Sequence, residues 1–368
     1  MWKTHEGTTG RLLQLCLGYF FFYVITGVSV KYFLGPAELG MPQLKGLQFL
    51  VYSTFGGSMV ATGVVLICRW YRMQSSTYVQ WGKLRFPVEL LYIVPSGVCT
   101  AVVIPTTTLM YTLPISVMVA MVIMRGSIIV VSRLVDEVQI RQGILKKTVY
   151  WQENVAVLFA IAAVSITVLG SRGGDGKKHF EFLTNTAAMT IFSSYVVAYT
   201  IRIYIMNYYK NTRGKGVKQD NKAFFGVEQI AACVTLCLVT LVIFFLPVSI
   251  GGDIEQVQVV RAAISEPHEK WVGATLAGMA FGIVAFFSVF IFMFKGRTAT
   301  FAGLVNRLTS LVAGTVATVY FWLVYNSAKK PKTEDWYSLG FILVAVAFLT
   351  MSERRRVAEL TATHEIDA

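Results

Sequence analysis

Long uncharged runs of apolar residues alternate with short polar segments along the chain. A helix needs about 20 apolar residues to cross the hydrocarbon core of a bilayer, and ten runs approach or exceed that length. Their ranges are 11–33, 47–70, 88–111, 114–135, 153–171, 182–207, 224–249, 271–294, 298–325 and 336–352. Because lipid offers a backbone no hydrogen-bond partners, we predict that all ten are helices. The connections near 112–114 and at 295–297 are so short that each predicts an antiparallel helical hairpin.

The distribution of Lys and Arg predicts the orientation of these helices. One set of alternate loops, together with both termini and the adjoining helix ends, carries 21 of the 33 basic residues, and the opposite set carries 10. Basic residues accumulate on the cytoplasmic side of membrane proteins. We therefore expect both termini in the cytosol and an even number of spans.

The ten spans divide into two groups of five at the polar segment 171–182. Since five is odd, the second group would cross the membrane inverted relative to the first, as in many alternating-access transporters. The predicted fold class is thus an all-α membrane protein of two inverted five-helix repeats, 11–171 and 182–352. Residues 1–10 form an N-terminal segment, and 353–368 form a polar tail that we expect to be disordered from 357 onward.

The composition agrees with a bilayer environment. Of the 368 residues, 55% are hydrophobic and only 14% are charged, whereas a soluble domain carries nearer a quarter charged residues. The net charge of +13 is scattered over short loops, so it indicates membrane topology and not nucleic-acid binding. The five cysteines show no metal-ligand spacing, and the four histidines lie in tails or loops. We therefore expect no metal, no cofactor and no enzymatic activity.

Two arginines lie deep in apolar spans. Arg125 and Arg307 each lie about ten residues into their spans, at corresponding places in the two repeats. An arginine at a helix centre costs about 2.5–3.5 kcal/mol on insertion scales, which favours a cavity, a partner or a substrate. The guanidinium fork holds carboxylate or phosphate through two parallel hydrogen bonds. The two arginines are candidates for an anion site, and the alternative is structural pairing with helix-end carbonyls or with Glu228.

The remaining candidates lie nearer the helix ends. Lys31 and Arg202 each precede an aromatic residue at matching places in the repeats, and the alternative is that both are interfacial anchors. Glu228 is the acid that lies clearly within a span, where it would pair with an arginine or carry a proton.

Two pairs of tyrosines share helix faces. Tyr19 and Tyr23, and likewise Tyr195 and Tyr199, are four residues apart, so both rings of a pair lie on one face. They would stack on a substrate or pack between helices. Small residues mark close helix contacts, among them the GxxxG at Gly278 and the pair Gly56-Gly57.

This pattern resembles the drug/metabolite transporter superfamily, over residues 11–352. Locally it is similar to the nucleotide-sugar and organic-phosphate translocator branch. The end of the first span reads Lys31-Tyr32, the sixth carries Arg202, and the ninth reads Asn306-Arg307 where the branch has a Lys-Arg pair. The resemblance implies a central cavity lined by the first four and the sixth to ninth spans. It places the fifth and tenth spans at the periphery, at a homodimer contact.

The sequence therefore predicts a transporter of a small organic anion, such as a nucleotide sugar or a phosphorylated metabolite, working by alternating access and exchange. The expected partners are the lipid bilayer and the organic substrate. The predicted substrate-binding residues are Arg125, Arg307, Asn306, Lys31, Arg202, Tyr23 and Tyr199. The resemblance implies a Golgi or endoplasmic reticulum membrane in a eukaryote and the inner membrane in a bacterium. Two alternatives stay open, an exporter of neutral or cationic metabolites and a membrane scaffold without transport.

Overall fold

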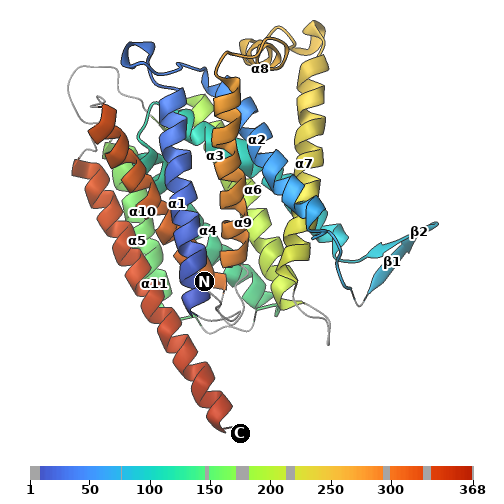
Figure 1. The fold of residues 1–368 in the computed structure, drawn as a ribbon. Helices are drawn as coiled ribbons and strands as arrows, with labels where there is room; N and C mark the ends of the chain where they lie inside the picture. Colours follow the sequence, from blue (N-terminus) through green and yellow to red (C-terminus); the bar gives the residue numbers. More distant parts are fainter. Residues whose placement is uncertain are drawn as a thin grey trace.

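The computed structural model of the chain describes residues 9–75, 77–145, 149–170, 182–212, 220–292, 299–325 and 333–366. Within these ranges it is a bundle of long helices (Figure 1). The helices are α1 (Thr9–Phe33), α2 (Gly46–Ile67), α3 (Leu90–Thr112), α4 (Val117–Arg141), α5 (Trp151–Gly170), α6 (Thr186–Asn211), α7 (Asn221–Phe245), α8 (Glu255–Ser265), α9 (Trp271–Phe292), α10 (Ala299–Tyr325) and α11 (Thr333–Ile366). Two single 3-10 turns, η1 (Ala37–Leu39) and η2 (Val248–Ile250), lie in connections.

The described helices fit a multi-pass membrane protein. Nine of those within the described ranges are long and apolar enough to cross a bilayer, and α5 is apolar over Trp151–Thr167. Many large apolar side chains on their outer faces are exposed, for example Leu158, Leu238 and Phe245. In a bilayer, lipid covers such side chains. The prediction of an all-α integral membrane protein is thereby confirmed at this level.

Local sequence explains where several helices begin. Ser116 caps α4 by accepting a hydrogen bond from the backbone N–H of Val119, and Asn185 caps α6 in the same way. Asp220 accepts from two backbone N–H groups at the start of α7. Such caps satisfy donors that the first helical turn leaves without partners. The short link between α3 and α4 fits the helical hairpin predicted near 112–114, whereas 295–297 lies outside the described residues.

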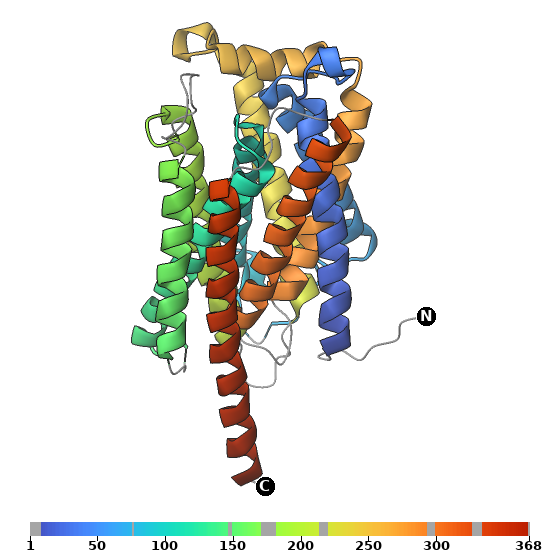
Figure 2. The same ribbon diagram turned by 90° about the vertical axis from the view of Figure 1, so that its left-hand side faces the viewer.

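Three features differ from the sequence prediction. Strands β1 (Tyr78–Trp81) and β2 (Leu84–Pro87) form an antiparallel hairpin after α2, which therefore ends earlier than expected. Helix α8 is short and lies across one end of the bundle (Figure 1). The tail expected to be disordered from 357 is instead helical to Ile366, because its Ala, Leu, Glu and Arg residues favour helix. Figure 2 shows this last part of α11 projecting well beyond the other helices.

The packing brings distant parts of the chain together. Helix α2 packs along α9, and α5 packs along α11. Helix α3 lies against α6 and α7, while α1 lies against α9 and α10. Helix α4 contacts α5, α6 and α10, so its middle is deeply buried. Both ends of the described chain lie at the same end of the bundle, which we call the terminal end (Figures 1 and 2).

Candidate functional site

Arg125 is buried at the middle of α4, with only 6% of its surface exposed. One terminal nitrogen donates a hydrogen bond to the hydroxyl of Tyr23 at 2.6 Å, and the other donates to Tyr195 at 3.5 Å. Tyr23 also bonds to the hydroxyl of Tyr111 at 2.8 Å, and the guanidinium lies over the Tyr23 ring at 5.6 Å. No carboxylate of the described part of the chain bonds to Arg125, and its Nε has no partner there. A buried cation is thus held by neutral hydroxyls and the face of the Tyr23 ring.

The two tyrosine pairs surround this arginine from α1 and α6. The rings of Tyr19 and Tyr23 meet edge to face at 5.1 Å, and those of Tyr195 and Tyr199 lie 5.3 Å apart. All four side chains are buried. The predicted helix-face pairs therefore pack as neighbours, and together they form an aromatic wall around one charge.

Arg202 on α6 has a different environment. Its Nε and one terminal nitrogen donate to the two carboxylate oxygens of Glu228 on α7, each at 2.8 Å. The hydroxyl of Ser96 on α3 donates to the same carboxylate at 2.6 Å. Glu228 is 1% exposed. Of the roles predicted for Glu228, the structure therefore contains the ion pair, and the partner is Arg202.

Lys31 lies at the far end of α1 and binds backbone. Its ammonium group donates to the carbonyls of Tyr111, Leu113 and Ile115 at 2.6, 3.2 and 2.8 Å. These carbonyls belong to the end of α3 and to the link that leads to α4. The carbonyl of Leu113 also accepts from the backbone N–H of Ile115. By binding carbonyls at this helix end, the lysine ties α1 to the α3–α4 hairpin.

Arg307 and Asn306 lie on α10, where they contact α4 and α9. Arg307 donates to the hydroxyl of Ser132 on α4, and it lies near enough to Arg125 for the two charges to repel each other. Asn306 donates to the hydroxyl and the carbonyl of Ser288 at 2.9 and 3.3 Å. These contacts join α10 to its neighbours.

A cavity opens beside Arg125, and the centre of a water molecule can reach about 70 Å³ of it. Its walls come from α1, α2, α3, α4, α6, α7 and α9, and they include Tyr19, Tyr23, Arg125, Tyr199 and Arg202. As far as the described residues go, α5, α10 and α11 contribute nothing to its lining. The cavity therefore joins four of the seven predicted substrate-binding residues and leaves out Lys31, Asn306 and Arg307.

Several polar residues of this cavity escaped the sequence analysis. Thr54 and Ser58 lie one turn apart on α2, and their hydroxyls have no hydrogen-bond partner in the described structure. Gln229 adds an amide from α7. The four-residue spacing of Thr54, Ser58 and Thr62 is the signal that could have shown a polar stripe on α2.

The charge of the cavity wall follows from these contacts. Arg125 and Arg202 are its lining cations, and Glu228 neutralises Arg202. What remains is one buried positive charge, beside hydroxyls that can donate or accept. Among the described residues, no three His, Cys, Asp or Glu side chains are grouped in a way that could hold a metal ion.

Comparison with known proteins adds little. No family model matches the chain, and no curated protein matches its sequence. One solved structure, described only as "Crystal structure of protein", aligns with 95% of this chain and 99% of its own, at 13% identity and a TM-score of 0.48. A likeness of that degree assigns neither family nor function.

Proposed function

We propose that the protein is a multi-pass membrane transporter of a small organic anion, working by alternating access and exchange. The observation that carries the proposal is Arg125, a buried guanidinium at the wall of a cavity, bonded to tyrosine hydroxyls and to no carboxylate of the described chain. A charge buried without a counter-ion is costly. A substrate carboxylate or phosphate would supply the missing charge.

The lining of the cavity, more than its size, suits a small metabolite. The centre of a water molecule can reach about 70 Å³ of the cavity, which is less than the about 300–1,000 Å³ of ligand pockets, so a metabolite would bind a wider form of it. Aromatic rings of Tyr19, Phe225 and Phe281 form part of the wall, and the hydroxyls of Thr54 and Ser58 lie on another part. This mixture fits an anion that also carries a ring or hydroxyl groups, such as a nucleotide sugar or a phosphorylated metabolite.

Helix packing supports ten spans in two five-helix repeats. Counting α9, α10 and α11 as the eighth, ninth and tenth spans, most contacts recur when each span is replaced by the one five later. The packing of α2 on α9 corresponds to that of α7 on α3, and α3 on α6 corresponds to α9 on α1. The pair α5 and α11 maps onto itself.

The residues that line the cavity show the same correspondence between the two groups of five spans. The lining positions of α3 recur on α9 with a constant separation of 181: Thr100, Val103, Ile104 and Thr107 against Phe281, Val284, Ala285 and Ser288. The tyrosine pairs of α1 and α6 are separated by 176 residues throughout. A site between inverted repeats is where substrates of secondary transporters bind.

Binding to the cavity can be tested with the full-length protein in detergent. Nucleotide sugars, nucleotides, sugar phosphates, carboxylates and amines are added in turn, and the melting temperature is recorded. We expect one class of anion to stabilise the wild type and to leave Arg125→Gln unchanged. Arg141→Gln is the matched control, since Arg141 lies on the same helix but is 79% exposed at its side chain.

Two outcomes would contradict the proposal. Stabilisation by amines or neutral solutes alone would favour an exporter of such metabolites. An Arg125→Gln variant that responds to the anion as strongly as the wild type would make this arginine a structural residue. Uptake of the same anion into liposomes, faster when they are preloaded with it, tests exchange.

A further inference from the structure

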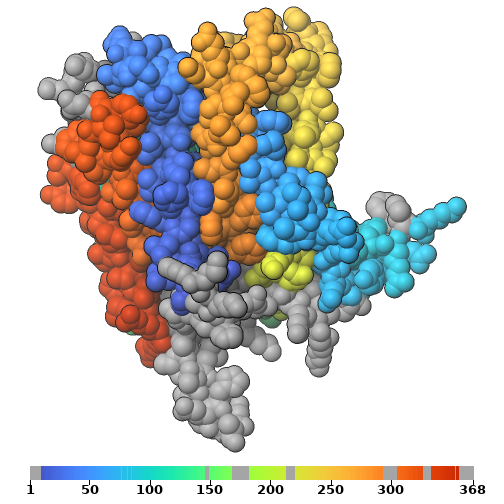
Figure 3. Space-filling model, in the orientation of Figure 1, coloured from blue at the N-terminus to red at the C-terminus, as the bar shows by residue number. Residues whose placement is uncertain are grey.

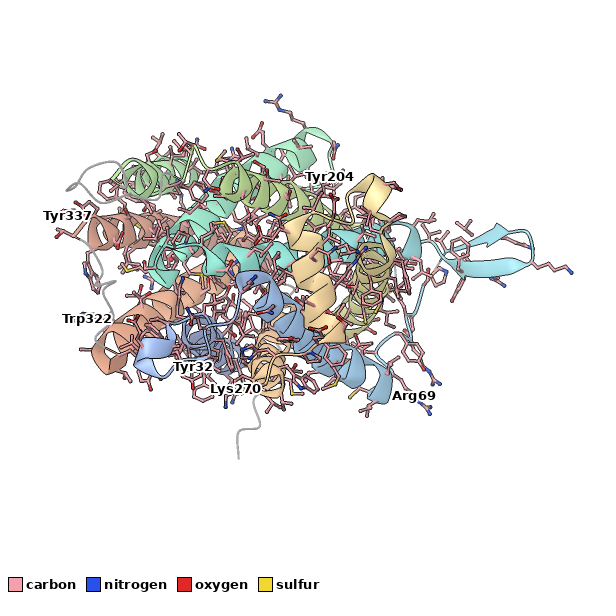
Figure 4. All side chains as sticks on the ribbon, turned by 90° about the horizontal axis from the view of Figure 1, so that it is seen from above. Tyr32, Arg69, Tyr204, Lys270, Trp322 and Tyr337 are labelled. Atoms are coloured by element: carbon pink, nitrogen blue, oxygen red, sulfur yellow. The ribbon has the colours of Figure 1, made fainter. Side chains whose placement is uncertain are left out.

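The β1–β2 hairpin leaves the bundle sideways. Figure 1 shows it at the terminal end, pointing away from the helices, and Figure 4 shows from above that it extends well beyond the bundle. In the space-filling view it stands clear of the helices on that side (Figure 3). Its link to the bundle is at its base, where β2 contacts α3. A membrane that surrounds the bundle would lie beside a segment so placed.

The register gives the hairpin two different faces. Val79 pairs with Phe86 and Trp81 pairs with Leu84, while Gln80 pairs with Arg85 between them. Since successive residues of a strand alternate between faces, the paired residues Val79 and Phe86 share one face, and both are apolar. Tyr78, Gln80, Arg85 and Pro87 belong to the opposite face, where the guanidinium of Arg85 lies over the Tyr78 ring at 4.7 Å. An isolated two-stranded hairpin is marginally stable in water, so an apolar face of this kind needs a cover.

The segment around the hairpin carries several cations and no acids in its sequence. Arg69, Arg72, Lys83 and Arg85 are exposed, and no Asp or Glu occurs from residue 68 to residue 88. Glu89, the next acid along the chain, is 8% exposed. Arg69 lies at the edge of the molecule on the side from which the hairpin projects (Figure 4).

Aromatic residues hold the base of the hairpin at the end of the bundle. Trp70 packs against Phe225, Phe286 and Phe290 with ring centroids 5.6–6.4 Å apart. Tyr71 is exposed beside it. Tryptophan and tyrosine collect where hydrocarbon meets head groups, so this end of α2 has the composition of an interfacial belt.

The backbone of the hairpin limits how deeply it can lie in a bilayer. Each strand of a two-stranded hairpin has one edge without a β partner, and open edges do not occur in the hydrocarbon core. The apolar face in turn is unsuited to bulk water. The head-group region satisfies both, with the apolar face toward the acyl chains and the cations among phosphates.

We propose that the β1–β2 hairpin lies along the membrane surface at the terminal end and binds anionic phospholipid head groups through Arg69, Arg72, Lys83 and Arg85. Anionic lipids give a leaflet a negative surface potential that attracts clustered basic residues. This site is distinct from the cavity and does not depend on what the cavity binds.

Native mass spectrometry of the full-length protein tests the proposal. Micelles are supplemented with phosphatidylglycerol or phosphatidylcholine, and bound lipid is counted for each variant. We expect the wild type to prefer phosphatidylglycerol and Lys83→Gln/Arg85→Gln to lose about 30-fold in that affinity, since each basic residue near the surface contributes to the attraction. The control Lys45→Gln/Lys270→Gln removes two exposed cations at the other end and should bind as the wild type does.

A second measurement tests the apolar face. Trypsin can cleave after Lys83 and Arg85, and we expect slower cleavage in nanodiscs that contain phosphatidylglycerol than in detergent. Val79→Ser/Phe86→Ser should remove that protection and leave the melting temperature of the bundle unchanged. Equal binding of the two lipids by the wild type, or equal phosphatidylglycerol binding by the wild type and Lys83→Gln/Arg85→Gln, would overturn the proposal.

Discussion

At the scale of single residues, partners distinguish cations that look alike in the sequence. Arg125 and Arg202 both face the cavity, but Arg202 shares two hydrogen bonds with Glu228 and Arg125 meets only tyrosine hydroxyls. Lys31 binds three carbonyls instead. The same positive charge thus has three chemical settings, and each setting gives a different expectation for a mutation.

Breaking the Arg202–Glu228 pair should destabilise the protein strongly. Glu228→Gln removes the charge that compensates a buried guanidinium, and we expect a loss of about 3–5 kcal/mol in unfolding free energy. Replacing both residues by methionine should restore much of the stability, because no charge is then left unpaired. Thermal unfolding of both variants in one detergent measures the difference. A double variant as unstable as Glu228→Gln would contradict this account.

Lys31→Met should affect stability and not affinity. The substitution takes the ammonium donor from three carbonyls, of which Leu113 keeps the backbone N–H of Ile115, at a cost of about 1–3 kcal/mol. The cavity wall stays intact. The melting temperature should fall, and the dissociation constant of the stabilising anion should stay within twofold of the wild type. A large loss of affinity would instead support the sequence prediction that Lys31 binds the substrate.

The sequence predicted a site residue only where its type was unusual for its surroundings, such as a charge within an apolar run. Arg125 stands out because it is a lone charge in an apolar run. Helix spacing predicted that the tyrosines around it pack in pairs. That Glu228 pairs with Arg202 and not with another arginine depends on how α6 and α7 pack, which the sequence does not show. The acceptors of Lys31 are carbonyls, which every residue has. In the sequence, Thr54 and Ser58 cannot be told apart from hydroxyl residues such as Thr100, whose hydroxyl donates to a carbonyl of its own helix.

At the scale of elements, glycine decides how closely α2 and α9 approach. A Cβ on Gly278 would collide with the backbone of Ser53, and one on Gly282 would collide with the backbone of Gly57. The predicted small-residue positions on the two helices therefore face each other. On the other side of the cavity, a Cβ on Gly97 of α3 would meet the backbone of Glu228 on α7.

Alanine substitutions at a glycine inside this contact and at one outside it should have opposite effects on stability. Gly278→Ala forces the α2 and α9 backbones apart and should cost about 1–3 kcal/mol. Gly63→Ala on α2 meets no atom within 4 Å and should stabilise by about 0.5–1 kcal/mol, since alanine favours helix over glycine. Melting temperatures of the two variants provide the comparison. A neutral Gly278→Ala would show that the helices are not held in backbone contact.

Apolar length predicted the helices well and their ends poorly. The fourth span was expected to stop at 135, whereas α4 continues to Arg141. Val135, Asp136 and Gln139 of this last part are buried, and Glu137 bonds to Arg133 and Arg141 along the helix surface. Helix α8 and the β hairpin are too short and too polar to register as spans. Their positions are set by contacts with α2, α7 and α3.

At the scale of the whole molecule, both ends of the described chain lie at one end of the bundle, and the bias of basic residues predicts that this end is cytosolic. The prediction can be checked by thiol labelling of intact host cells, in a chain whose five cysteines are replaced. Glu38→Cys, in η1 at the opposite end, should react with an impermeant maleimide, and Arg141→Cys should react only after permeabilisation. The reverse pattern would invert the topology.

The charge of Arg125, which no carboxylate of the described chain bonds to, has an electrical consequence if the protein alternates as proposed. The empty form carries that positive charge from one face to the other, whereas the form loaded with a monovalent anion carries one positive charge less. Membrane voltage therefore acts on the return of the empty carrier, by about 2.3 kcal/mol per 100 mV if the charge crosses the whole field. One-for-one exchange should be insensitive to voltage, and net efflux of the anion should accelerate when the cell interior is negative.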